Sequence, residues 1–226
     1  MGSSARMMAR KAAQRRRPVE GVSEVLLQAT APEDGRLVAL TQEGDLAAFN
    51  TLVETYRGQV YNLCWRMLGL REAAEDATQE AFLSAYRNIR RFRGPSFRAW
   101  LLRIAANTAT DELRRRHRRP QVSLEAPIST SETALDLPDP SAGPEECALR
   151  LEQARCLQAA LLTLPLDQRL SVILSDVQGL SYEEVGQAMG SSLGTVKSRI
   201  SRGRARLRRY LLERGELSLP GQRPTL

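Results

Sequence analysis

Histidine, lysine and cysteine are scarce in this sequence of 226 residues, which contains one histidine, two lysines and three cysteines. The cysteines are odd in number and two of them lie within helical patterns, so we do not expect a disulfide scaffold. A zinc site takes about four ligands, and His117 lies in an arginine run far from any cysteine pair. We therefore expect neither a metal site nor a cofactor.

Catalytic signatures and long apolar segments are missing as well. The sequence contains no phosphate-binding loop or nucleophile elbow, and His117 has no candidate partner for acid–base chemistry. We therefore expect neither an enzyme nor a small-molecule substrate. No run of 18 or more apolar residues could span a bilayer. The basic start of the chain lacks the apolar stretch of a signal peptide, which predicts a cytoplasmic protein.

Arginine is abundant and unevenly distributed, and the formal net charge is +7. Residues 1–19 carry six bases and no acid, residues 90–119 ten arginines against two acids, and residues 197–214 eight bases against one acid. Residues 120–149 carry six carboxylates and no base. An arginine excess alone could reflect a GC-rich genome, but composition does not explain the clustering. Because clustered cations release counterions when they neutralise phosphates, we predict a nucleic-acid partner.

Apolar residues recur at spacings of three and four along most of the chain, and strand-like alternation is missing, which predicts an all-α fold. Asp45 is placed to cap a helix that Gly69 ends. Five prolines among Ser, Thr and acidic residues at 120–144 predict a flexible linker between two small helical domains, each with its own core. The expected helices are 32–43, 45–69, 72–89, 97–116, 145–164, 166–177, 181–190 and one from 192 onward. The expected division is a disordered basic arm (1–31), a first domain (32–118), an acidic proline-rich linker (119–144), a second domain (145–213) and a tail (214–226).

The end of the second domain has the pattern of a helix-turn-helix. Ser181 and Glu184 form a capping-box sequence that opens a short helix, and Gly190 ends it. A longer basic helix follows from Ser192, which together is typical of a DNA-binding helix-turn-helix. The apolar stripe expected to face inward is Leu193, Val196, Ile200, Leu207 and Leu211.

The exposed face of this last helix has the residues that reading a major groove requires. Short polar side chains let the backbone approach the groove, and cations reach base edges and phosphates. The base-facing candidates are Thr195, Lys197, Ser198, Ser201 and Arg202, while Arg199, Arg204, Arg206, Arg208 and Arg209 suit the phosphate backbone. The alternative is a solvated amphipathic helix that packs on a neighbour.

In the first domain, aromatic residues alternate with arginines. Phe92, Phe97 and Trp100 lie among arginines, and Asn107 precedes the arginine run that begins at Arg114. Aromatic faces beside cations suit unstacked bases of a single strand. The alternative is that these aromatics are core residues at helical spacing. That reading is favoured for Phe97, while for Trp100 the two remain open.

Several motifs occur in a fixed order along the chain. They are Asp76-Ala-Thr-Gln79-Glu80-Ala-Phe82, Phe92-Arg-Gly94, Trp100-Leu-Leu-Arg-Ile104-Ala-Ala-Asn107 with Asp111-Glu-Leu-Arg-Arg, and Gly194-Thr-Val-Lys-Ser-Arg199. Together they resemble the extracytoplasmic-function group of RNA polymerase sigma factors, over about Gly44 to Leu212. The resemblance implies that residues 32–118 are sigma region 2 and residues 145–213 are sigma region 4.

The resemblance also implies partners and site residues. Core RNA polymerase would be bound at its beta-prime clamp and beta flap, with the clamp contacted by Asp76, Gln79 and Glu80. The minus-ten element would be read as an opened non-template strand with a flipped base held around Asn107. The residues implied for that strand are Trp100, Arg103, Asn107, Arg114 and Arg115. The residues implied for the minus-thirty-five duplex are Thr195, Lys197, Ser198, Arg199, Ser201 and Arg202.

Further expectations follow from the same resemblance. Ser201 is small where relatives carry a larger side chain, so the resemblance does not fix the exact sequence preference. The linker of about 27 residues reaches about 90 Å, two to three duplex turns of about 34 Å, so both domains can sit on one promoter. An anti-sigma factor is an expected partner. The competing hypothesis is a helix-turn-helix regulator that does not bind polymerase core, which explains only the second domain.

Overall fold

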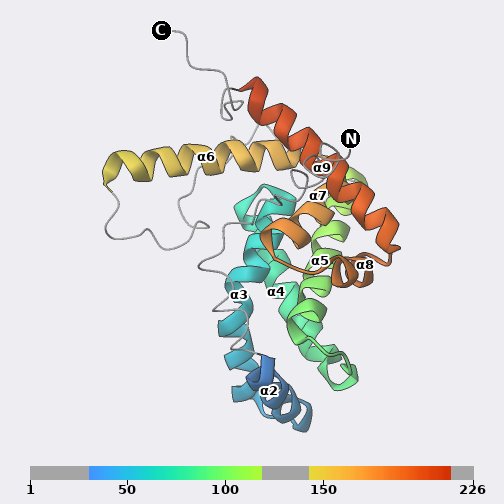
Figure 1. Cartoon of the computed structure of the whole chain (residues 1–226). Helices are drawn as coiled ribbons and strands as arrows, with labels where there is room; N and C mark the ends of the chain where they lie inside the picture. Colours follow the sequence, from blue (N-terminus) through green and yellow to red (C-terminus); the bar gives the residue numbers. More distant parts are fainter. Residues whose placement is uncertain (1–30, 119–142, 215–226) are drawn as a thin grey trace, which may run out of the picture.

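The computed structural model describes residues 31–118 and 143–214. The predicted basic arm, most of the predicted linker and most of the predicted tail lie outside these residues. Every regular element in the described ranges is helical, which confirms the predicted all-α fold (Figure 1). In chain order the elements are α2 (Ala31–Glu43), α3 (Leu46–Leu68), α4 (Arg71–Asn88), the 3₁₀ turn η1 (Ile89–Arg91), α5 (Phe97–Arg118), α6 (Pro144–Leu162), α7 (Leu166–Val172), the π turn η2 (Ile173–Val177), α8 (Tyr182–Met189) and α9 (Leu193–Glu213).

The residues predicted to start or end helices do so in the structure. The Asp45 carboxylate accepts hydrogen bonds from the backbone N–H groups of Ala47 (2.8 Å) and Ala48 (3.1 Å), which caps α3. Gly69 ends α3 with φ of 73°, a left-handed conformation that glycine adopts without a steric penalty. Ser181 and Glu184 complete the predicted capping box at α8. These three helix boundaries are therefore set by local chemistry.

The first domain is built from α3, α4 and α5, which pack against one another, with α2 against α3. Its buried side chains include Leu52, Tyr56 and Leu102. The Tyr56 hydroxyl donates a hydrogen bond to the Asp34 carboxylate, which ties α2 to α3. Burial raises the pKa of Asp34, so this carboxyl is held in an environment that disfavours its charge.

In the second domain α9 packs across α7, and α8 packs against α9. Val196 and Ile200 are buried as predicted, and Leu207 and Leu211 are half-buried. The prediction for Leu193 is wrong, because this side chain is 39% exposed. It lies in the first turn of α9, and helical side chains lean toward the N-terminus, beyond the packed part of the helix. Gly203 instead completes the buried stripe, since a Cβ there would lie 2.7 Å from the Val172 side chain.

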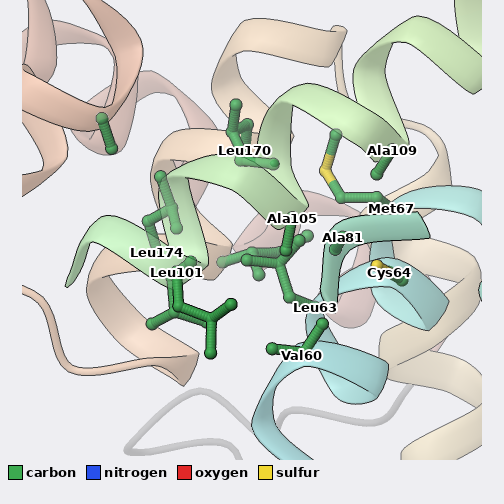
Figure 2. Close-up of a cluster of buried hydrophobic side chains, with 14 of the residues drawn as sticks. Val60, Leu63, Cys64, Met67, Ala81, Leu101, Ala105, Ala109, Leu170 and Leu174 are labelled. Atoms are coloured by element: carbon green, nitrogen blue, oxygen red, sulfur yellow. The ribbon is translucent and has the colours of Figure 1, made fainter. Parts of the chain in front are cut away.

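The two domains are packed together, and the expected pair of separate cores is not what the structure shows. Buried side chains of both domains form one continuous cluster, in which Val60 and Leu101 of the first domain lie with Leu170 and Leu174 of the second (Figure 2). The reason is that each small domain leaves an apolar face that its own helices do not cover. The predicted domain boundaries stay a prediction.

Within residues 31–118 and 143–214, no helix is both long and apolar enough to cross a membrane.

Candidate nucleic-acid interface

The first turns of α9 expose a short, polar and cationic face. Lys197, Ser201 and Arg202 are exposed, and Thr195 and Ser198 are half-buried. Helical spacing places these residues outside the buried stripe of Val196 and Ile200, with Ser198 on the opposite side of the helix. Ser192 caps the start of the helix, since its hydroxyl accepts a hydrogen bond from the Thr195 N–H (3.3 Å). The predicted base-facing residues are thus together on one accessible face.

Two arginines of α9 are held by acids of the same domain. Arg199 donates from Nη1 to the Ser191 hydroxyl (2.8 Å) and from Nη2 to the Asp167 carboxylate (2.6 Å), and its side chain is 24% exposed. Arg204 binds both carboxylate oxygens of Asp176, with Nε 2.9 Å from Oδ2. This hydrogen bonding raises the pKa of Arg204. Both arginines therefore fasten α9 to α7 and η2.

Sequence reasoning missed the two acids that bind these arginines. Asp167 and Asp176 lie 32 and 28 residues before their partners, so no local spacing signals either pair. The remaining cations of the helix are exposed, and no acid among the described residues forms an ion pair with them. They are Lys197, Arg202, Arg206, Arg208 and Arg209.

The α5 helix of the first domain carries a second candidate surface. Trp100, Arg103 and Asn107 follow one another at spacings of three and four, so they share one helix face. Arg103 and Asn107 are exposed, and Trp100 is half-buried. The Trp100 ring lies 5.0 Å from that of Phe92 and 5.7 Å from that of Phe97, measured between centroids. Trp100 therefore packs on the core and keeps part of its surface accessible, and its contact with an unstacked base stays a prediction.

The structure also places the other predicted residues of α5, one of them in the core and two on the surface. Phe97 is 3% exposed, which confirms it as a core residue. Arg114 and Arg115 are exposed and pair along the helix with Asp111 (3.3 Å) and Glu112. Exposed pairs of this kind contribute little stability, so they cost little to exchange for phosphate contacts.

A cavity of about 450 Å³ lies beside the loop that leads into α5. Its walls come from α2, α3, this loop, the start of α5 and α8, and include Tyr56, Phe92, Arg98 and Glu184. The Gln42 amide of α2 holds the loop by donating to the carbonyls of Ile89 (2.8 Å) and Phe92 (3.1 Å). Sequence reasoning missed Gln42 and Glu184, because neither stands near the loop in sequence.

The α4 helix presents a different kind of surface. Asp76, Gln79 and Glu80 are exposed on one face, opposite the buried side chains of Phe82 and Ala85. Leu83 lies four residues after Gln79 and three after Glu80 and is 51% exposed, so it adds an apolar centre to the polar face. An exposed leucine framed by polar side chains suits a protein partner better than DNA. Sequence reasoning did not single out Leu83.

Comparison with protein families places two matches on the two domains. The family described as Sigma-70 region 2 matches residues 52–119, and the family described as Sigma-70, region 4 matches residues 154–207. The first range contains α4 and α5, and the second contains α8 and most of α9.

Curated relatives match across both domains. The chain is similar to the ECF RNA polymerase sigma factor SigE of Mycolicibacterium smegmatis (40% identity, 74% of this chain and 64% of that protein). It is also similar to the ECF RNA polymerase sigma factor SigW of Bacillus subtilis (37% identity, 75% and 92%) and the ECF RNA polymerase sigma-E factor of Escherichia coli K12 (40% identity, 76% and 90%). The match thus spans less than two thirds of the mycobacterial relative and about nine tenths of the other two.

Two solved structures share the arrangement of the helices. One is CnrH in complex with the cytosolic domain of CnrY, with a TM-score of 0.56 and 27% identity over 79% of this chain and 96% of that one. The other is the sigma factor RpoE in complex with the anti-sigma factor NepR from Bartonella quintana, with a TM-score of 0.56 and 27% identity over 72% of this chain and 96% of that one.

Proposed function

The chain belongs to the extracytoplasmic-function group of sigma-70-family sigma factors, and on that premise we propose that it binds core RNA polymerase and directs transcription initiation at specific promoters. In this role it supplies specificity and is not itself an enzyme. It needs no metal, cofactor or small-molecule substrate, and it works in the cytoplasm, where polymerase acts.

The exposed face of α4 supports contact with polymerase. Asp76, Gln79 and Glu80 offer hydrogen-bond acceptors and a donor around the apolar Leu83. Interfaces between proteins commonly combine an apolar centre with a polar rim. We assign this face to the clamp of the beta-prime subunit, and the second domain to the beta flap.

The exposed face of α5 supports capture of an opened minus-ten strand. Trp100 offers a partly accessible ring for stacking, Asn107 can read a base edge, and Arg103, Arg114 and Arg115 can bind phosphates. Extruding a base from the stack costs a few kcal/mol, which such contacts offset. Asn107 is the residue we assign to the flipped base.

The exposed face of α9 supports reading of the minus-thirty-five duplex. Lys197, Ser201 and Arg202 are accessible together near the helix N-terminus, where a recognition helix contacts base edges. We assign the bases to Thr195, Lys197, Ser198, Ser201 and Arg202. Arg199 is engaged with Asp167 and Ser191, so its contribution is to orient the helix.

An anti-sigma factor is part of the proposal. The two similar solved structures hold a sigma factor with NepR, described as an anti-sigma factor, and CnrH with a domain of CnrY. A partner of that class would hold this chain inactive until a signal releases it.

The proposal depends mainly on one observation: both family matches fall on domains that expose a surface suited to a partner. These surfaces are the polar face of α4 with its apolar centre, the aromatic and cationic face of α5, and the cationic face of α9. A helix-turn-helix regulator that does not bind polymerase would explain α9 but leave the polar and apolar face of α4 without a role. The test is run-off transcription with purified core polymerase on a library of promoter fragments, beside co-purification with core. We expect selective transcripts and a stable complex. Tight duplex binding without affinity for core would support the regulator instead.

A further inference from the structure

The loop between η1 and α5 is held by a side chain that is distant from it in the sequence. Gln42 stands in the last turn of α2, 47 and 50 residues before the two backbone carbonyls that its amide binds, those of Ile89 (2.8 Å) and Phe92 (3.1 Å). A primary amide has two N–H donors, so both donors of Gln42 are used within the protein. Gln42 is half-buried, which limits the competition of water for these bonds.

The two carbonyls stand where η1 ends and no further helical turn supplies a donor. Their other hydrogen bonds are local. The Phe92 N–H donates to the Ile89 carbonyl (3.0 Å), and the exposed Arg93 donates from Nη1 to the Phe92 carbonyl (2.7 Å). Local bonds of this kind can move with the loop, whereas the bonds from Gln42 tie it to another helix.

The α2 helix has a fixed place in the first domain. The Tyr56 hydroxyl of α3 donates to the Asp34 carboxylate near the start of α2, and Val38 is 6% exposed in the core. The helix also packs against η1 and α5. Gln42 therefore extends from a support whose position does not depend on the loop.

The loop in turn supports the surface proposed for the single strand. The centroid of the Phe92 ring lies 5.0 Å from that of Trp100 and 6.0 Å from that of Phe97. Gly94 lets the loop pass close to the same ring, since a Cβ there would lie 2.9 Å from it. One of the carbonyls that Gln42 holds belongs to Phe92 itself, so this hydrogen bond also fixes the ring on which Trp100 rests.

We propose that Gln42 is a positioning residue for the minus-ten strand, which holds Phe92 so that Trp100 is already in place when an unstacked base arrives. Gln42 does not read a base in this role, because its two donors are used within the protein. The role in strand capture rests on the proposed function. A ring that is held in advance loses less conformational entropy when a base stacks on it. Loss of Gln42 therefore weakens strand capture and leaves the polymerase-binding and duplex-binding faces intact.

The first measurement follows Trp100 in the free full chain. The chain contains two tryptophans, so Trp65→Phe leaves Trp100 as the only one. Emission wavelength and quenching by acrylamide are compared for this chain and for the same chain with Gln42→Met, which keeps a side chain of similar length and removes both donors. Gln153→Met is the matched control, because Gln153 is an exposed glutamine of α6.

We expect Gln42→Met to shift the emission of Trp100 to longer wavelength and to increase its quenching, because a ring without its support meets more water. Gln153→Met should leave both properties unchanged. Unchanged emission and quenching in Gln42→Met would overturn the proposal. If Gln42→Met loses its helical circular dichroism, Gln42→Glu replaces it, because a carboxylate of the same shape has no N–H to donate.

The second measurement follows strand opening by the chain bound to core polymerase. The probe is a promoter fragment selected by its run-off transcript, on which permanganate reports unpaired thymines. We expect Gln42→Met to lower opening about tenfold, a factor typical of the loss of two neutral hydrogen bonds, with unchanged affinity for core polymerase and for the minus-thirty-five duplex. Gln153→Met should open the fragment normally. Normal opening by Gln42→Met would show that Gln42 has no part in strand capture.

A Trp100→Ala background distinguishes a positioning residue from one that only stabilises the fold. In that background Gln42→Met should cause no further loss of opening, because the ring through which it acts is gone. Equal losses with and without Trp100 would indicate general destabilisation and contradict the proposal. Failure of the unchanged chain to open any promoter with polymerase would count against the proposed function. The fluorescence of Trp100 in the free chain would still decide whether Gln42 positions this ring.

Discussion

Arg204 of α9 holds both carboxylate oxygens of Asp176 in η2, so the long basic helix is bound to the domain that carries it at a point two residues beyond Arg202, the last of its base-facing residues. A planar guanidinium matches a carboxylate in this two-contact geometry, which fixes orientation as well as distance. The arginine is about half exposed, so the pair is screened by solvent and its value lies in orientation more than in stability.

A double-mutant cycle tests this pair. We expect Arg204→Ala and Asp176→Ala each to lower the free energy of unfolding by about 1 kcal/mol or less, with a coupling energy of about 0.5 kcal/mol. Urea denaturation followed by circular dichroism measures all four proteins. Arg208→Ala on the same helix serves as the control and should change the free energy little. Strictly additive effects would show that the two side chains do not interact in solution.

The two classes of arginine in α9 predict different responses to salt. Arg202→Ala should weaken binding to a minus-thirty-five duplex by about tenfold and leave the slope of log affinity against log salt nearly unchanged, because Arg202 is assigned to a base edge; a slope lower by about one would assign it to a phosphate instead. Arg199→Ala should mainly lower stability, because Arg199 is bound to Asp167 and Ser191. Fluorescence anisotropy at about 50 to about 300 mM salt measures the duplex affinity of each variant. Arg150→Ala in α6 is the control.

Removal of the Asn107 side chain should separate strand opening from polymerase binding. We expect Asn107→Ala to bind core polymerase normally and to form open complexes about 10-fold less well, because a buried base edge would lose its hydrogen bonds. Permanganate footprinting of unpaired thymines measures opening. Asn50→Ala replaces an exposed asparagine of α3 and should have no effect. Normal opening by Asn107→Ala would remove this residue from the strand site.

The face of α4 should be required for polymerase binding. We expect Leu83→Ala to lower the affinity for core polymerase by about tenfold, since an exposed leucine at the centre of an interface is buried on binding, and Gln79→Ala with Glu80→Ala to lower it further. Leu149→Ala removes a similarly exposed leucine, at 55%, from α6 and should leave the affinity unchanged. Biolayer interferometry with immobilised core gives the affinities. Unchanged binding in all the α4 variants would show that the docking assignment is wrong.

Burial of Cys64 predicts an alkaline limit to stability. Burial raises the pKa of this thiol to about 12, so the folded protein keeps the proton at a pH where the unfolded chain has released it. Stability contributed by Cys64 is therefore present below about pH 9 and falls by up to about 1.4 kcal/mol per pH unit above it. Urea midpoints of the chain and of Cys64→Ala, measured from pH 8 to about 11, should converge as pH rises. A difference that stays constant with pH would contradict the shift.

Short-range signals in the sequence predicted much of this fold. Asp45 and Gly69 could be identified from sequence as the ends of α3, because a carboxylate that caps N–H groups and a glycine at positive φ act within a few residues of themselves. The same holds for the capping box of α8. The predicted burial of Leu193 was wrong because burial depends on a neighbouring helix that is distant in sequence. Helical periodicity gives the direction of a side chain but not how far that neighbouring helix extends.

The sequence by itself determined the all-α fold, the positions of the helix ends, the basic character of α9 and the order of motifs that places the chain in its family, because each depends on neighbouring residues or on composition. Only the tertiary structure decided which arginines are bound to partners within the protein. Arg98, Arg199 and Arg204 find their partners 28 to 80 residues away, and Gly203 is needed for its contact with Val172. A guanidinium binds any carboxylate or carbonyl within reach, so its role follows from what folding brings beside it and not from its neighbours in the chain.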